Sequence, residues 1–178
     1  FDGTGDYLNI PSSSGWVFSD DFTLELWVRK TVNNGGDNAV MITYGTDQDW
    51  GQNGFIFRLN GSDQISFQRN NGSGGAGFTL NGSTALSTNV WYHAAIVRSG
   101  TTYKLYLNGT EDGTNTVGYG AIQSLGHPLR IGADKDVTTS TVFKAGYMDE
   151  IRISDSARYT TNFTPSTTAF TRDDNTLL

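Results

Sequence analysis

The sequence predicts an all-β domain of two antiparallel sheets packed face to face. Glycine is frequent, with 22 residues among 178, whereas charged residues make up only 17% of the chain. Glu and Lys, which usually cover the solvent faces of helices, are scarce. Six Asn-Gly pairs punctuate the chain, and both residue types accept the positive φ of tight hairpin turns. This composition is typical of short strands joined by tight turns.

Alternation of apolar and polar residues locates the strands. In Phe22–Arg29 every second residue is apolar, and the residues between them point the other way. Further strands are predicted at 55–59, 65–68, 91–98, 103–107, 129–131 and 147–153, with turns at 60–63, 99–101 and 108–109. The expected core residues are Phe22, Leu24, Leu26, Val28, Phe55, Phe57, Ile96, Leu105, Ile151 and Ile153.

Length, cysteine content and charge limit the number of domains and the kinds of partner that this chain can have. A chain of 178 residues suits one domain with a sizeable core. The absence of cysteine leaves the redox compartment open. The net charge of −6, without a basic stripe, argues against nucleic acid as a partner. No apolar run approaches the roughly 20 residues that cross a bilayer, so we expect no membrane insertion.

Four segments together resemble one family. They are Phe1–Ile10, Phe22–Val28, Trp91–Arg98 followed by Leu105–Gly109, and Met148–Ile153. Their order and spacing resemble laminin-G-like domains of the concanavalin A-like lectin/glucanase superfamily. The resemblance implies a two-sheet antiparallel jelly-roll sandwich.

The C-terminal residues carry a second resemblance. Ala157–Pro165 and Phe170–Leu177 look like connectors in phage and marine bacterial surface proteins, where such domains occur in multidomain chains or tandem arrays. Both ends of the chain are therefore expected to be cuts through a longer polypeptide. We expect a β-sandwich over 1–155 and a C-terminal extension or connector over 156–178, which packs on the same domain or leads out of it. Ser154–Tyr159 is the one segment that could form a helical turn, because Ser154 or Asp155 could cap it.

No catalytic residue is predicted, although the resemblance includes glycosidases of the laminarinase and agarase kind. Their Glu-x-Asp-x-x-Glu cluster is absent, and Glu25 stands alone in its strand. Asp149 and Glu150 are adjacent and are expected to face opposite ways, whereas retaining hydrolysis needs two carboxylates about 5–5.5 Å apart. His93 and His127 are isolated and no Gly-x-Ser-x-Gly elbow occurs, so we expect both histidines to be structural or exposed to solvent.

Calcium is the expected cofactor. Sandwiches of this kind often hold one structural Ca²⁺ where the first and last strands meet, and Asp2 and Asp149 match those positions. Carboxylates and neighbouring carbonyls are the ligands that Ca²⁺ prefers. The alternative is that both are ordinary turn or edge acids. The acidic pairs Asp134 with Asp136 and Asp47 with Asp49 are weaker candidates.

Ligand binding is predicted in loops. Trp50 lies in a polar segment between Asp47 and Gln52, where an indole face and the carboxylates of Asp47 and Asp49 could bind a sugar. The alternative is a Trp50 that packs over the edge of the sandwich. Weaker candidates are Tyr119, Trp16 and the loop that contains Asp134, whereas Trp27 and Trp91 are expected to pack within strands.

The leading hypothesis is a non-catalytic recognition or adhesion module outside a cell or on a virion. It would bind a glycan or another cell-surface component, and contact neighbouring domains of its own polypeptide or virion proteins. One alternative is a structural decoration domain of a capsid or tail without a small ligand. The other is a divergent glycoside hydrolase.

Overall fold

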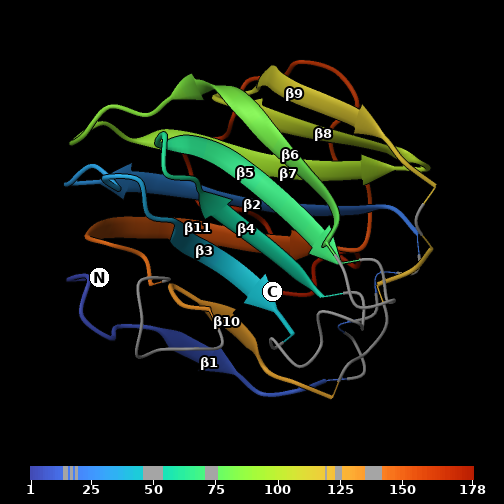
Figure 1. Ribbon diagram of the computed structural model, residues 1–178. Coiled ribbons are helices and arrows are strands. Elements are labelled where there is room, and N and C mark those ends of the chain that lie inside the picture. Colours follow the sequence, from blue (N-terminus) through green and yellow to red (C-terminus); the bar gives the residue numbers. More distant parts are fainter. Residues whose placement is uncertain are drawn as a thin grey trace.

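The protein is an all-β sandwich without helices in the described part of the chain. The computed structural model describes residues 1–13, 16, 18, 20–45, 54–70, 76–118, 120–122, 126–134 and 142–178. Eleven strands lie within these residues (Figure 1). They are β1 (Leu8–Ile10), β2 (Phe22–Lys30), β3 (Ala39–Tyr44), β4 (Phe55–Leu59), β5 (Gln64–Asn70), β6 (Ala76–Ala85), β7 (Tyr92–Ser99), β8 (Thr102–Leu107), β9 (Thr110–Thr116), β10 (Leu129–Ile131) and β11 (Gly146–Ser154). These residues contain no helix that is long and apolar enough to cross a membrane.

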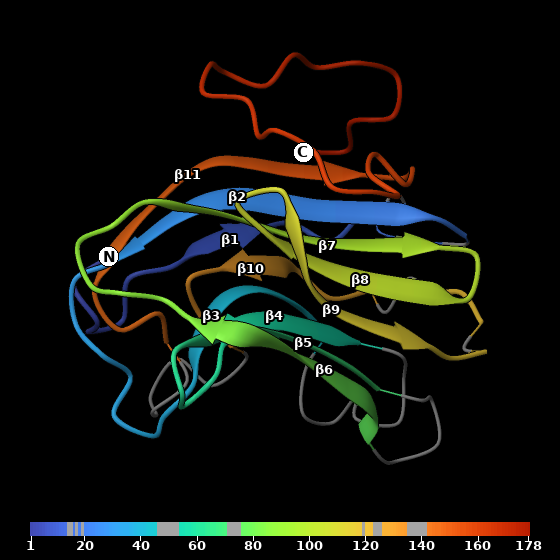
Figure 2. The same cartoon turned by 90° about the horizontal axis from the view of Figure 1, so that it is seen from above.

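The strands form two antiparallel sheets, as the sequence predicts. The six-stranded sheet has the order β1-β10-β3-β4-β5-β6, and the five-stranded sheet has the order β11-β2-β7-β8-β9. Figure 2 shows the two sheets stacked, with β3 to β6 on one side and β2, β7 and β11 on the other. The jelly-roll sandwich expected from the sequence is confirmed.

The core lies between the two sheets and is rich in aromatic residues. Nine of the ten core residues that the alternation predicts are buried, and the tenth, Ile151, is partly buried and packs against the others. Phe67 lies at the centre of an aromatic cluster, and its ring contacts those of Phe22, Phe55 and Tyr103 at centroid distances of 5.9 to 6.1 Å. Each such buried side chain contributes about 1.5–3 kcal/mol from the area that it removes from water.

Some of the Asn-Gly pairs form the predicted turns, and one lies within a strand. Asn108 and Gly109 both have positive φ, at 50° and 76°, and they close the predicted hairpin between β8 and β9. The turn after β4 instead places its positive φ on Asp63, at 63°. Asn81-Gly82, predicted as a reversal, lies inside β6, where Gly82 leaves space for the carboxylate of Asp112.

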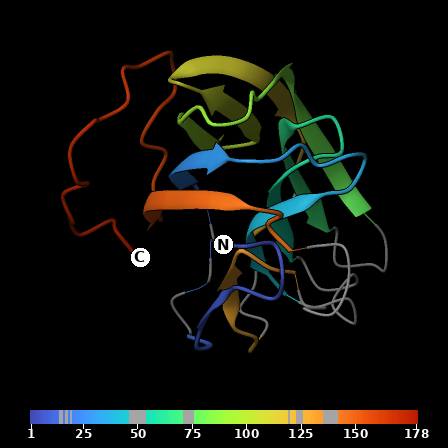
Figure 3. The same cartoon turned by 90° about the vertical axis from the view of Figure 1, so that its left-hand side faces the viewer.

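The C-terminal segment 155–178 lies against the outer face of the five-stranded sheet. Figure 3 shows this segment, in red, on the side of that sheet away from the six-stranded sheet. Its end returns to β11, where Ile153 N donates to Leu178 O and Ser154 forms a bridge with Thr176. The helical turn considered for Ser154–Tyr159 is wrong, because β11 continues through Ser154 and the residues after it are irregular.

Candidate functional site

The outer face of the six-stranded sheet carries a continuous polar surface. Residues at matched register positions on adjacent strands point to the same face of a sheet. One row across the sheet, on its outer face, contains Asn9, Arg130, Thr43, Ile56, Gln68 and Thr79. The next row contains Val40, Arg58, Ser66 and Asn81. Eight polar or charged side chains therefore share this face with two apolar neighbours, Val40 and Ile56.

The central polar side chains of this face are enclosed rather than freely exposed. Thr43, Ser66 and Gln68 are all buried, and Arg58 is half-buried. Thr43 Oγ1 donates to Phe55 O at 3.1 Å, and Arg58 Nη2 donates to Gln68 Oε1 at 3.0 Å. These hydrogen bonds fix the orientation of the side chains across β3, β4 and β5.

Three polar atoms of this face have no hydrogen-bond partner within the described protein. They are Arg58 Nε, Ser66 Oγ and Arg130 Nη1, and all three are buried. A buried polar group without a partner costs about 1–3 kcal/mol, so native proteins usually satisfy it. The face therefore has donors and a hydroxyl that a polar ligand could satisfy.

A carboxylate lies close enough to this face to affect its electrostatics. Burial lowers the pKa of Arg58 from its ordinary value, and the negative charge of Asp134 partly opposes this shift. Asp134 follows β10 in the chain and is one of the ligand-binding residues predicted from the sequence. The structure thus associates Asp134 with Arg58, a residue that sequence reasoning missed.

Most other predicted ligand-binding residues lie outside the described part of the chain. This holds for Asp47, Asp49, Trp50 and Tyr119, and equally for the alternative metal ligand Asp136. Trp16 is described and buried, and its Nε1 donates to Pro11 O at 3.3 Å. Trp16 therefore packs in the core and offers no platform to a sugar.

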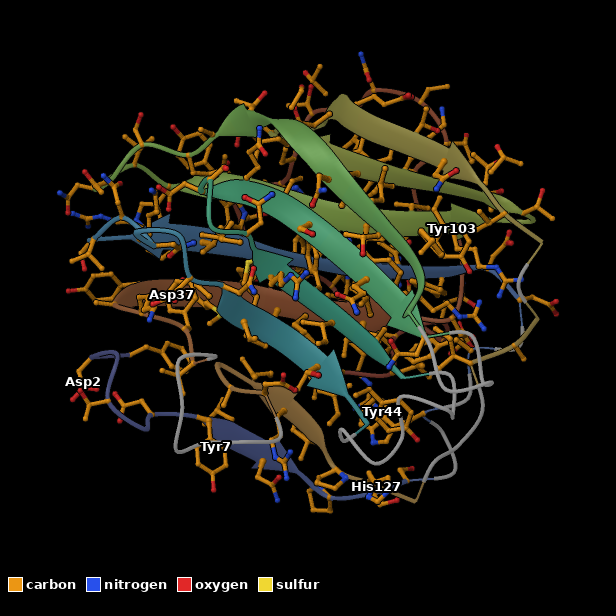
Figure 4. The ribbon with its side chains drawn as sticks, viewed as in Figure 1. Asp2, Tyr7, Asp37, Tyr44, Tyr103 and His127 are labelled. Carbon is orange, nitrogen blue, oxygen red and sulfur yellow. The ribbon has the colours of Figure 1, made fainter. Side chains whose placement is uncertain are left out.

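The two predicted calcium ligands lie near different points of β11. Phe1 exchanges two backbone hydrogen bonds with Gly146 at the start of β11, which places Asp2 at this end of the strand (Figure 4). Asp149 pairs with Trp27 three residues further along β11, roughly 10 Å from Gly146 at the usual strand rise. The described residues contain no group of three His, Asp or Glu side chains that could hold a metal.

The outer face of the five-stranded sheet contains a buried cluster around Glu25. Arg152 Nε donates to Glu25 Oε1 at 2.8 Å, and Tyr159 OH donates to Glu25 Oε2 at 2.9 Å. His93 Nε2 lies 3.1 Å from Glu25 Oε2. Burial would raise the pKa of Glu25, but the hydrogen bonds and charge of His93 and Arg152 outweigh burial and hold this pKa below its ordinary value.

The C-terminal segment covers this cluster. The rings of Tyr159 and Phe163 stack at 3.5 Å, and Phe163 meets Tyr106 of β8 edge-on at 5.4 Å. Burial, followed by the nearby carboxylate of Glu25, raises the pKa of Tyr159 to about 12. His93 is fully buried beneath these rings, so its role here is structural.

Comparison with known proteins agrees with the fold. A family model described as the concanavalin A-like lectin/glucanases superfamily matches residues 2–162. No protein among those with curated descriptions matches the chain in sequence.

Three similar solved structures come from carbohydrate-related proteins. A putative carbohydrate-binding protein from Bacteroides ovatus is 22% identical over 86% of this chain, with a TM-score of 0.67, and the chain spans 42% of its length. A second similar structure is domain 4 of AbnA, a GH43 extracellular arabinanase from Geobacillus stearothermophilus, in complex with arabinotriose. It is 19% identical to this chain, with a TM-score of 0.63, and the match covers 86% of this chain and 69% of that one. The CBM40 of a Ruminococcus gnavus IT-sialidase, bound to α2,3-sialyllactose, is 14% identical, with a TM-score of 0.62 over 88% of this chain and 95% of that module.

At these identities the structural likeness concerns the fold alone. The sequence match covers most of the chain, and the two-sheet topology agrees with it. The chain belongs to the concanavalin A-like lectin/glucanase superfamily.

Proposed function

We propose that this domain is a non-catalytic carbohydrate-binding module whose ligand binds to the outer face of the six-stranded sheet. The observation that carries the proposal is the polar surface that crosses β10, β3, β4 and β5, with unpaired polar atoms on Arg58, Ser66 and Arg130. Sugar hydroxyls both donate and accept hydrogen bonds. They can therefore satisfy the arginine donors and the amide and carboxylate acceptors of one surface.

The arrangement of acids supports binding rather than hydrolysis. Glycosidases of the common kind use two carboxylates on either side of the scissile bond. The two rows of described residues on this face include no Asp or Glu, and Asp134 is the carboxylate that approaches Arg58. Among the described residues, Asp134 alone provides no acid and nucleophile pair.

The proposed setting is extracellular, as one domain of a longer polypeptide on a cell surface or a virion. The similar structures include a domain of an extracellular arabinanase and the mouse laminin α1 chain. In such a setting the domain would hold its parent protein on a glycan. A decoration domain without a small ligand is the rival function, and it predicts no sugar binding.

The test is a glycan array screen followed by calorimetric titration of the best ligand. In Arg58→Gln the affinity should fall about tenfold or more, because hydrogen bonds to a charged group contribute about 1.5–3 kcal/mol. Arg172→Gln, an exposed arginine of the C-terminal segment, is the matched control and should bind as the unmodified domain does. Absence of any glycan ligand, or equal affinity in both variants, would contradict the proposal. Release of reducing ends from the bound glycan would contradict its non-catalytic part.

A further inference from the structure

A cavity lies on the side of the sandwich opposite the polar face, between the five-stranded sheet and the C-terminal segment. Its volume is about 350 Å³, which is within the usual range of small-ligand sites. Its lining residues are Trp27, Trp91, Asp149, Glu150 and 167–169. None of these residues belongs to the polar face of the six-stranded sheet.

Strand register explains why two indoles and a carboxylate meet there. Trp27 of β2 pairs directly with Asp149 of β11. Trp91 immediately precedes β7, whose first residue, Tyr92, pairs with Val28. The expectation that Trp91 packs within a strand is wrong, because Trp91 lies outside β7 and 39% of its surface is exposed. Its ring centroid is 6.3 Å from that of Tyr147, which is 55% exposed.

A β-bulge brings a second carboxylate to the same cavity. The register of β11 against β2 shifts between Asp149 and Arg152, and Glu150 has a φ of 48°. Bulges redirect side chains, and positive φ at a residue other than glycine is strained and often marks a functional site. The adjacent acids expected to face opposite ways therefore line one cavity, and this expectation is corrected.

Some polar atoms of the cavity form hydrogen bonds within the described part of the protein, and others do not. Trp27 Nε1 donates to Ser166 O at 3.2 Å, which fixes this indole as a wall. Glu150 Oε2 accepts from Phe170 N at 2.6 Å, and Asp149 Oδ1 accepts from Glu150 N at 2.9 Å. Each carboxylate has a second oxygen that accepts no hydrogen bond from the described part of the protein.

We propose that this cavity is a second carbohydrate site, which takes one neutral pyranose unit. An exposed indole offers a flat apolar surface to the C–H face of a sugar ring. The carboxylates of Asp149 and Glu150 accept hydrogen bonds from its hydroxyls, and the same two charges repel a sugar acid. The site makes the domain bivalent, with one site on each outer face of the sandwich, and does not depend on ligand binding at Arg58.

Saturation-transfer NMR and tryptophan fluorescence titrations test this site with defined probes. The probes are methyl β-D-glucopyranoside and methyl β-D-galactopyranoside, with methyl β-D-glucuronide as the acidic counterpart of the first. We expect at least one neutral glycoside to bind, and to bind about fivefold or more tightly than the glucuronide. Trp91→Ala and Asp149→Asn should each weaken binding of the neutral glycoside about fivefold or more.

Control variants separate this proposal from the first one. Tyr7→Ala removes an exposed aromatic residue elsewhere, and Arg58→Gln alters the six-stranded face, so neither should change binding of the glycoside at this cavity. Thermal melting of each variant verifies that it folds. The second site is refuted if neither neutral glycoside binds, or if Trp91→Ala binds as tightly as Tyr7→Ala. Loss of binding in Arg58→Gln but not in Trp91→Ala would refute the second site and support the first.

Discussion

The two outer faces of the sandwich use outward-pointing polar residues in different ways. On the five-stranded sheet the buried carboxylate of Glu25 has three partners, and the C-terminal segment covers the cluster. On the six-stranded sheet, polar atoms of Arg58, Ser66 and Arg130 have none among the described residues. Strand alternation produces both faces, but among the described residues the chain completes the first and leaves polar atoms of the second without partners. We infer that the second face is completed by a ligand.

Isolated unpaired atoms also occur on the five-stranded sheet, and their surroundings differ. His93 Nδ1 and Tyr106 OH are buried without a partner. Aromatic rings of the C-terminal segment lie against both residues, with Phe163 5.7 Å from His93 and 5.4 Å from Tyr106. A contiguous polar surface, rather than a single unpaired atom, is therefore what distinguishes the candidate binding face.

Among the proposed variants, Glu25→Ala should cause the largest loss in the free energy of unfolding, because it disrupts the covered face of the five-stranded sheet. Removal of the carboxylate leaves Arg152, His93 and Tyr159 without their shared partner in a buried site. We expect a loss of about 3–5 kcal/mol in the free energy of unfolding, measured by urea denaturation. The matched control is Glu111→Ala, which removes an exposed partner of Lys104 and should cost about 1 kcal/mol or less. Equal losses in the two variants would show that the Glu25 cluster does not hold the five-stranded face together.

Phe163→Ala should have the next largest effect, since it loosens the covering segment and leaves the cluster beneath it intact. Phe163 is partly buried and contacts three rings. We expect a loss of about 2 kcal/mol, somewhat below the usual cost for a fully buried Phe. Hydrogen exchange of segment 155–178 should accelerate, while exchange in β4 and β5 should stay the same. Unchanged exchange in the segment would contradict its anchoring by Phe163.

Alkaline pH should destabilise the covered face in a way that depends on Tyr159. The pKa of Tyr159 is raised to about 12 in the folded protein, above the ordinary value near 10 of an unfolded chain. The stabilisation is thus fully present below pH 10 and is lost as pH rises toward 12, because the unfolded state ionises first. In Tyr159→Phe the melting temperature should fall less steeply over this window than in the control Tyr7→Phe. Equal dependence of melting temperature on pH in the two variants would show that ionisation of Tyr159 does not cause the alkaline destabilisation.

The smallest expected effect concerns calcium. Because the described residues contain no group of three His, Asp or Glu side chains that could hold a metal, any shift in melting temperature on adding Ca²⁺ or a chelator should be the same in the unmodified domain and in Asp149→Ala. A calcium response that disappears in Asp149→Ala would show that Asp149 holds the ion after all.

Alternation in the sequence predicts the strands with one buried face and fails where the pattern is absent. β2 is recognised because its apolar residues alternate. β3 is missed because all six of its residues, Ala39–Tyr44, are buried and Thr43 alone interrupts an otherwise apolar run, so apolar and polar residues do not alternate. β9 is missed for the opposite reason, since Thr110–Thr116 contains no large apolar residue and is placed by its pairing with β8.

Part of the candidate site could be found from the sequence. Arg58 lies between Phe57 and Leu59 in a predicted strand, so alternation alone turns it away from the core, and the predicted hairpin aligns it with Ser66. The meeting of Asp149 with Glu150 could not be found this way, because it depends on a bulge in β11 that forms against β2. Arg130 and Asp134 join the site through the pairing of β10 with β3, which links residues far apart in the chain.

The most direct test of the central claim is to map where a bound glycan protects the protein. Amide hydrogen exchange or NMR shift changes would be recorded with and without the best ligand from the array. We expect the main changes on β3, β4, β5 and β10, around Thr43, Arg58 and Gln68. Changes confined to β2, β7, β11 and the C-terminal segment would contradict a glycan site on the six-stranded face.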